Sequence, residues 1–169
     1  MATEKHRYCW RALPAVVLLL VMLALGGSVS ASAPMPSFSL PSVTDGSAVS
    51  SESFKGKVLL VTFFATWCPP CMEEVPSLIR LQQDYQGQDF SVVALAMDEG
   101  GPKVVARLVD KRKINYPVLM ADKGVKRDFG GIVGIPTSFL VNRNGVVVKK
   151  YPGLVSHAVL ERDIATVLR

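Results

Sequence analysis

Trp67-Cys68-Pro69-Pro70-Cys71 stands between an apolar run, Val58 to Phe64, and a stretch whose apolar residues recur at helical spacing. The run is predicted to be a buried strand and the stretch after it a helix. The unpaired N–H groups and the dipole at a helix N-terminus favour a thiolate over a thiol there. Two cysteines separated by two residues can also close a disulfide. The sequence therefore predicts a thiol–disulfide exchange site where the strand meets the helix.

Length and charge set the class of protein. The chain has 169 residues, a length typical of one domain with an ordinary core. Its formal net charge is +5, and the densest basic cluster is Lys111-Arg112-Lys113. A solvated helix end explains a cluster of that size better than a nucleic-acid site does, and we expect no nucleic-acid partner.

The chain contains three cysteines, and Cys9 lies in the basic N-terminal stub. Cys68 and Cys71 are therefore the only cysteine pair of the folded part. A structural disulfide and half of a zinc site are the alternatives. A scaffold stapled by disulfides would need more cysteines, and zinc normally needs about four ligands, of which the chain beyond the N-terminus offers these two and His157. We expect a redox-active disulfide, with no metal and no cofactor.

Residues 1–33 have the order of an export segment. Three basic residues among the first eleven precede an apolar stretch, Ala12 to Val29, and small residues follow it in Ser30-Ala31-Ser32-Ala33. This order is typical of a secretory signal peptide. The apolar stretch is also close to the length that spans a bilayer, so a retained membrane anchor remains an alternative. In both cases residues 34–169 form a domain that works outside the cytoplasm, in the periplasm or on the outer face of the membrane.

The rest of the chain alternates strands and helices. Ser28 to Ser37 is predicted to be a linker because it is rich in Ser, Ala and Pro, and Asn142-Arg143-Asn144-Gly145 is a strong hairpin signal. The predicted strands are Phe38–Leu40, Ala48–Ser50, Val58–Phe64, Phe90–Met97, Pro117–Met120, Thr137–Val141 and Val146–Tyr151, and helices are expected after Cys71, from Pro102, from Val125 and from a Ser156 cap. This order predicts a single α/β domain with a mixed central β-sheet that helices cover on both faces.

From about Phe54 to Leu168 the chain resembles the thioredoxin superfamily. Four features match in order: a strand followed by Trp67-Cys68-Pro69-Pro70-Cys71, a proline inside the next helix at Pro76, Ile135-Pro136-Thr137 at the start of a strand, and a closing hairpin with a helix. The resemblance implies a thioredoxin-like fold.

Within the superfamily the chain is most similar to the exported bacterial thiol–disulfide oxidoreductases of the TlpA, ResA and DsbE type. The sequence Phe64 to Cys71, together with Glu74 and Pro76, is typical of that branch. So is additional helix and strand after the second strand, here about Gly100 to Phe129. A helix–strand insert is therefore expected. The residues themselves predict an N-terminal hairpin, because the first two strands flank a turn that contains Asp45-Gly46.

We assign roles to the residues around the cysteine pair. Cys68 precedes the helix and is expected to be the exposed nucleophile, while Cys71 lies in its first turn and is expected to be the buried resolving thiol. Trp67 is either a platform for substrate or a lid on the core. The resemblance implies that the Ile135–Pro136 bond is cis and packs beside the cysteines, and that the backbone around Ile135 pairs with substrate polypeptide.

The proton acceptor is a separate question. Thioredoxin itself carries a buried acid six residues before the first cysteine, where this chain has Thr62. Glu99 falls where related exported proteins place an acid near the active site, and it is the candidate acceptor for Cys71; an ordinary polar turn at Asp98-Glu99 is the alternative. Glu73 and Glu74 are expected to be charges of the first helical turn, and His157 to be a surface residue.

The sequence thus favours an extracytoplasmic reductase of protein disulfides. By resemblance, its substrates are proteins with cysteine pairs, such as apocytochrome c during cytochrome c maturation or a copper-site protein, and a membrane-bound thiol-reducing protein supplies electrons. A copper metallochaperone is the alternative binding function, although such relatives generally have three residues between the cysteines and a downstream histidine. A thiol peroxidase of the peroxiredoxin kind would need Thr where this chain has Ala65.

Overall fold

The computed structural model describes residues 33–169. The predicted signal or anchor, residues 1–33, lies outside the described residues except for Ala33, and so does Cys9. Among residues 33–169, no helix combines the length and the apolar character that a membrane span requires.

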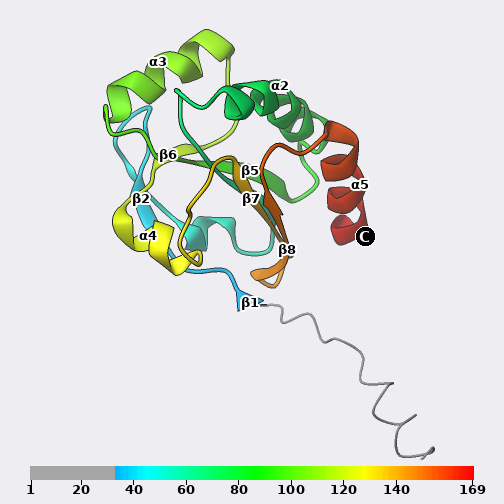
Figure 1. Cartoon of the computed structure of the whole chain (residues 1–169). Coiled ribbons are helices and arrows are strands. Elements are labelled where there is room, and N and C mark those ends of the chain that lie inside the picture. Colours follow the sequence, from blue (N-terminus) through cyan, green and yellow to red (C-terminus); the bar gives the residue numbers. More distant parts are fainter. Residues whose placement is uncertain (1–32) are drawn as a thin grey trace, which may run out of the picture. The chain divides into compact units, whose positions relative to one another are not determined.

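Within residues 33–169, six strands form a mixed sheet in the order β1-β8-β7-β4-β5-β6 (Figure 1). Neighbouring strands are parallel from β4 through β5 to β6, whereas β7 and β8 run antiparallel to their neighbours. The predicted mixed central sheet is therefore confirmed. The strands are β1 Ala33–Pro34, β4 Val58–Phe64, β5 Phe90–Ala96, β6 Val118–Met120, β7 Thr137–Val141 and β8 Val146–Pro152.

The predicted N-terminal hairpin is present as a separate pair of strands, β2 (Ser39–Pro41) and β3 (Ala48–Ser50). The predicted insert is present as well, since a helix, the edge strand β6 and a second helix lie between β5 and β7. The helices are η1 Ser51–Phe54, a 3-10 helix, and the α-helices α2 Pro69–Asp84, α3 Pro102–Arg112, α4 Lys123–Asp128 and α5 His157–Leu168.

Strand β4 lies in the middle of the sheet and is buried on both faces. Successive side chains of a strand point to opposite faces, and the core divides accordingly. Val58, Leu60 and Phe64 pack in a cluster with apolar residues of α2, α3 and α5. Leu59, Val61 and Phe63 pack with the N-terminal hairpin, η1 and α4. This burial fixes the end of β4, from which the chain leads directly into the cysteine pair.

Two local predictions differ from the structure. Ala33–Pro34, part of the predicted linker, pairs with Val146–Val147 of β8, and the N–H group of Met35 donates to Gly145 O at 2.8 Å. A proline is tolerated there because β1 is an edge strand. Ser156 occupies the N-cap position of α5 as predicted, but its side chain makes no capping hydrogen bond.

Candidate active site

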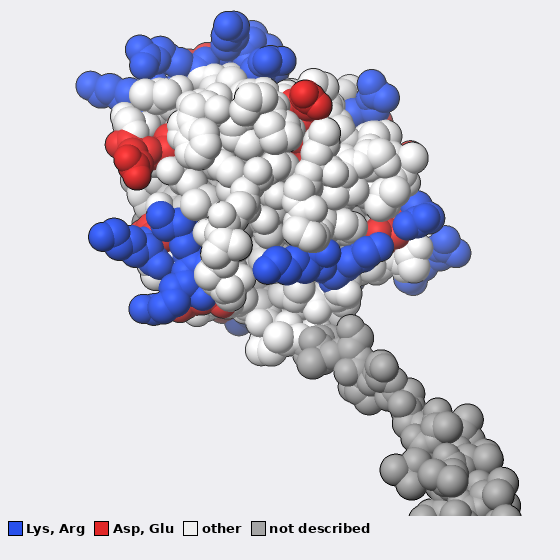
Figure 2. Space-filling model, viewed as in Figure 1, with Lys and Arg blue, Asp and Glu red and all other residues white. Residues whose placement is uncertain are grey.

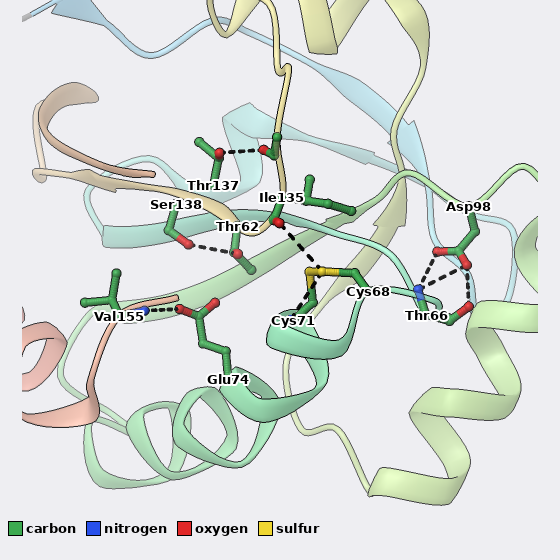
Figure 3. Close-up of a disulfide and its surroundings, with 11 residues drawn as sticks. Thr62, Thr66, Cys68, Cys71, Glu74, Asp98, Ile135, Thr137, Ser138 and Val155 are labelled. Carbon is green, nitrogen blue, oxygen red and sulfur yellow. Dashed lines mark hydrogen bonds between the residues drawn. A yellow bond between two sulfur atoms is a disulfide. The ribbon is translucent and has the colours of Figure 1, made fainter. Parts of the chain in front are cut away.

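The cysteine pair lies where β4 leads into α2. Cys68 is the N-cap residue of α2, and Pro69 and Pro70 fill the first helical positions, where a missing N–H group is tolerated. Cys68 and Cys71 form a disulfide, and the N–H group of Cys71 donates to Cys68 Sγ at 3.3 Å (Figure 3). The N-terminus of α2 thus points a backbone donor at the sulfur of Cys68. The structure shows the oxidised form of a thiol–disulfide pair.

Both cysteines are buried in this oxidised form. The exposed fraction is 3 % for Cys68 and 2 % for Cys71, so the expectation that Cys68 is exposed is wrong for the disulfide state. The physical reason is a loop from a distant part of the chain. The carbonyl oxygen of Ile135 lies 3.7 Å from Cys68 Sγ and covers it (Figure 3). What distinguishes Cys68 is its position at the N-cap rather than its exposure.

The loop that covers the disulfide precedes β7. Its Ile135–Pro136 bond is cis, as the resemblance implied. Pro136 is buried, and its carbonyl oxygen accepts a hydrogen bond of 2.8 Å from the N–H group of Gly153. This bond ties the loop to the end of β8. The fold therefore brings Ile135 and Pro136 beside a cysteine pair more than sixty residues earlier in the sequence.

Trp67 precedes the pair, and its side chain is 68 % exposed. This exposure excludes the interpretation of Trp67 as a lid on the core. A role as a substrate platform stays a prediction that the exposed position permits.

The two acids after β5 lie in different environments. Glu99, the predicted proton acceptor, is exposed, whereas Asp98 is buried. The Asp98 carboxylate accepts two hydrogen bonds of 3.1 Å from the Thr66 N–H group and one of 2.5 Å from the Thr66 hydroxyl (Figure 3). Asp98 therefore holds the loop between β4 and α2 in place. Its structural role was not anticipated from the sequence.

Glu74 is the second buried carboxyl group near the pair, and its exposed fraction is 2 %. Helix α2 begins at Pro69 and has no acidic residue in its first turn, so the expectation that Glu73 and Glu74 are first-turn charges is wrong; Glu73 is exposed, whereas Glu74 is buried. Burial raises the pKa of Glu74 to about 7, although the Val155 N–H group, which donates to Glu74 Oε1 at 3.4 Å, opposes the shift. The helical spacing of Cys71, Glu74, Val75 and Leu78 is the signal that could have predicted this burial.

Glu74 shares a helix face with Cys71, because residues three apart on a helix are neighbours. Figure 3 shows Glu74 about one helical turn beyond Cys71, with its carboxyl group turned toward Val155. A carboxyl group with a pKa near neutrality can both take up and release a proton at physiological pH. Glu74 is therefore a candidate, beside Glu99, for a group that exchanges protons near the pair.

Thr62 occupies the place of the buried acid of thioredoxin. It is buried in β4, and its hydroxyl oxygen accepts a hydrogen bond of 2.9 Å from the hydroxyl group of Ser138 in β7. Figure 3 shows the two hydroxyl groups joined to each other across β4 and β7. A neutral hydroxyl pair therefore stands where the acid of thioredoxin would be.

His157 lies apart from the cysteines. Its Nδ1 atom is 2.9 Å from the Ser77 hydroxyl oxygen, which joins the start of α5 to α2. Within residues 33–169, no three His, Cys, Asp or Glu side chains are arranged to hold a metal ion. The chemistry that the arrangement supports is thiol–disulfide exchange at Cys68 and Cys71.

Known proteins resemble this chain in sequence and in fold. Residues 30–168 match the model of the Redoxin family. The chain is 30 % identical over 131 residues to the thioredoxin-like protein YneN of Bacillus subtilis, covering 76 % of this chain and 75 % of that protein. It is 35 % identical over 122 residues to the thiol-disulfide oxidoreductase ResA of a strain of Bacillus cereus, covering 70 % of this chain and 69 % of that protein. The crystal structure of a thiol:disulfide interchange protein of the thioredoxin family from Chlorobium tepidum TLS superposes with a TM-score of 0.76 at 38 % identity, covering 84 % of this chain and all of that one.

Proposed function

Because this chain belongs to the Redoxin family and is a thiol–disulfide oxidoreductase of the thioredoxin superfamily, we propose that it reduces disulfides of substrate proteins outside the cytoplasm. The observation that carries the proposal is the Cys68–Cys71 disulfide at the N-terminus of α2, packed against Ile135. The order of basic, apolar and small residues in 1–33 supports export or anchoring.

The reaction begins with the reduced pair. The thiolate of Cys68 attacks one sulfur of the substrate disulfide, a mixed disulfide forms, and the other substrate sulfur leaves as a thiolate that takes a proton. Cys71 then loses its proton and attacks Cys68 Sγ, which releases the second substrate thiol. Two electrons pass from the protein to the substrate, and the protein ends as the disulfide described above.

Glu74 is the group that we propose to accept the proton of Cys71. Support comes from its shared helix face with Cys71, its burial and its pKa of about 7. Glu99 remains a candidate only for a form of the protein in which it approaches the pair, since its side chain is exposed here. Trp67, Ile135 and Pro136 are the residues that we propose to contact substrate.

The proposed substrates are proteins with cysteine pairs. More specifically, we propose an apocytochrome c or a copper-site protein. The spent disulfide must be reduced again from outside the chain. A membrane-bound thiol-reducing protein fits that role, because a soluble cytoplasmic thiol could not reach an exported domain.

Trapping tests the proposal. In Cys71→Ala the mixed disulfide cannot be resolved, so the full chain expressed in its own host is expected to carry substrate proteins disulfide-bonded to Cys68. Non-reducing electrophoresis and mass spectrometry identify the adducts, and Cys68→Ala is the matched control. Absence of adducts, together with full reductase activity of Cys68→Ala, would contradict the proposal. Stoichiometric Cu(I) binding without reductase activity would favour the metallochaperone instead.

A further inference from the structure

Two exposed apolar side chains belong to the segments that meet at the disulfide. Among residues 33–169, the large apolar side chains that are exposed are those of Trp67, Val133, Val148 and Leu154. Trp67 precedes Cys68. Val133 is 103 % exposed and lies two residues before Ile135, whose carbonyl oxygen contacts Cys68 Sγ. Trp67 and Val133 are therefore available to contact a polypeptide that approaches the disulfide.

A groove of about 250 Å³ lies beside Val133. Its walls are the segment 131–137, Lys150, Pro152 and Gly153. Ile135 connects the groove with the disulfide. It lines the groove, and its carbonyl oxygen lies 3.7 Å from Cys68 Sγ. An extended chain rises about 3.3 Å per residue, so a substrate whose cysteine is at Cys68 can place a residue a few positions away in the groove.

Lys150 is the charged side chain among the groove's walls. Its neighbour Lys149 points to the opposite face of β8 and forms an ion pair of 2.6 Å with Asp163. Lys150 instead lies with its Nζ atom 5.3 Å from the centroid of the Phe139 ring, and it is exposed. On the face that Figure 2 presents, Lys and Arg side chains, with a few Asp and Glu side chains, border a largely uncharged area. The residues that line the groove supply mostly apolar walls and one cation.

We propose that this groove binds the residues that flank the substrate cysteine, and that Lys150 makes the protein prefer substrates with an Asp or Glu there. The inference rests on the proposed reduction of substrate disulfides and names the class of substrate that the site selects. An ion pair between Lys150 and an acidic substrate residue would be exposed to solvent, and exposed ion pairs are weak. We therefore expect an acidic substrate to be reduced only about two to five times faster than a basic one. The preference is expected to weaken as salt screens the charges.

The test uses peptides that contain one internal disulfide. Each carries Glu, Gln or Lys at the second residue outside the disulfide, on either the N-terminal or the C-terminal side. The full-length protein is reduced beforehand and freed of reductant, so that it supplies the two electrons itself. The second-order rate constant of peptide reduction is measured by mass spectrometry at low and at high salt.

We expect the Glu peptide to react about two to five times faster than the Lys peptide on at least one side. Lys150→Glu is expected to invert the preference and Lys150→Gln to remove it. Lys103→Glu makes the same change of charge on an exposed residue of α3 and is expected to keep the wild-type preference.

Each outcome separates the inference from the function on which it rests. Equal rates for the Glu and Lys peptides, or a preference that Lys150→Glu leaves unchanged, would overturn the role of Lys150, while reduction of the Gln peptide would still support the oxidoreductase function. An equal shift in Lys103→Glu would show a general charge effect and would also overturn it. Failure to reduce any peptide would overturn both proposals.

Discussion

Replacing Glu74 with Gln tests whether the buried carboxyl group has the properties that the structure gives it. The pKa of Glu74 is raised from 4.5 to about 7 because the folded protein removes the carboxylate from water. Gln has nearly the same shape, and its amide oxygen can still accept the hydrogen bond from the Val155 N–H group. The substitution therefore removes the ionisation while changing little else.

The size and sign of the effect follow from linkage. Between pH 4.5 and about 7 the folded protein keeps a proton that the unfolded chain has released, so this group's contribution to stability falls as the pH rises. One pKa unit corresponds to about 1.4 kcal/mol, and the shift therefore costs the wild-type protein about 3 kcal/mol once Glu74 is ionised. Glu74→Gln is expected to match the wild type in acid and to exceed its free energy of unfolding by about 3 kcal/mol above neutrality.

Urea unfolding of the oxidised protein and of the variant, at several pH values from about 4 to about 8, measures this difference. Effects of other titrating groups cancel in the comparison. Glu73→Gln removes an exposed carboxyl group from the neighbouring position and controls for the loss of a negative charge on α2. A difference that stays constant across the pH range, or one that grows toward acid, would refute the reasoning. If Glu74 also accepts the proton of Cys71, the variant resolves mixed disulfides more slowly at neutral pH.

Two further substitutions test how the site is held in place. Asp98→Ala removes the acceptor of the Thr66 N–H and hydroxyl groups. Urea unfolding is expected to show a free energy of unfolding lower by about 2 kcal/mol. An unchanged unfolding midpoint would show that these hydrogen bonds make no net contribution to stability. Thr62→Val leaves the buried hydroxyl group of Ser138 without its acceptor and is expected to destabilise by about 1 to 3 kcal/mol. Adding Ser138→Ala should restore part of that loss in a double-mutant cycle, and simple additivity of the two changes would contradict the pairing.

The main elements were predictable because their signals are local. The uninterrupted apolar run of β4 indicated a strand buried on both faces, and all of its residues are buried. The turn Asn142 to Gly145 indicated a hairpin because such turns need a positive φ, and Gly145 has a φ of 74°. The spacing of the two cysteines and their position before a helix likewise predicted thiol–disulfide exchange. Both are properties of a few adjacent residues.

By itself the sequence therefore determined the order of strands and helices and the redox pair. Tertiary structure alone decided which groups surround that pair. Cys68 is covered because the Ile135 loop packs on it, and Glu74 is buried because the chain before α5 lies over it. Lys150 reaches the groove because β8 lies beside the start of β7. The helical spacing of Glu74 with Cys71 and Leu78 indicates a buried helix face, but it does not show which segment covers that face. Exposure and ionisation depend on which distant segments exclude water from a side chain, and the sequence pattern does not identify those segments.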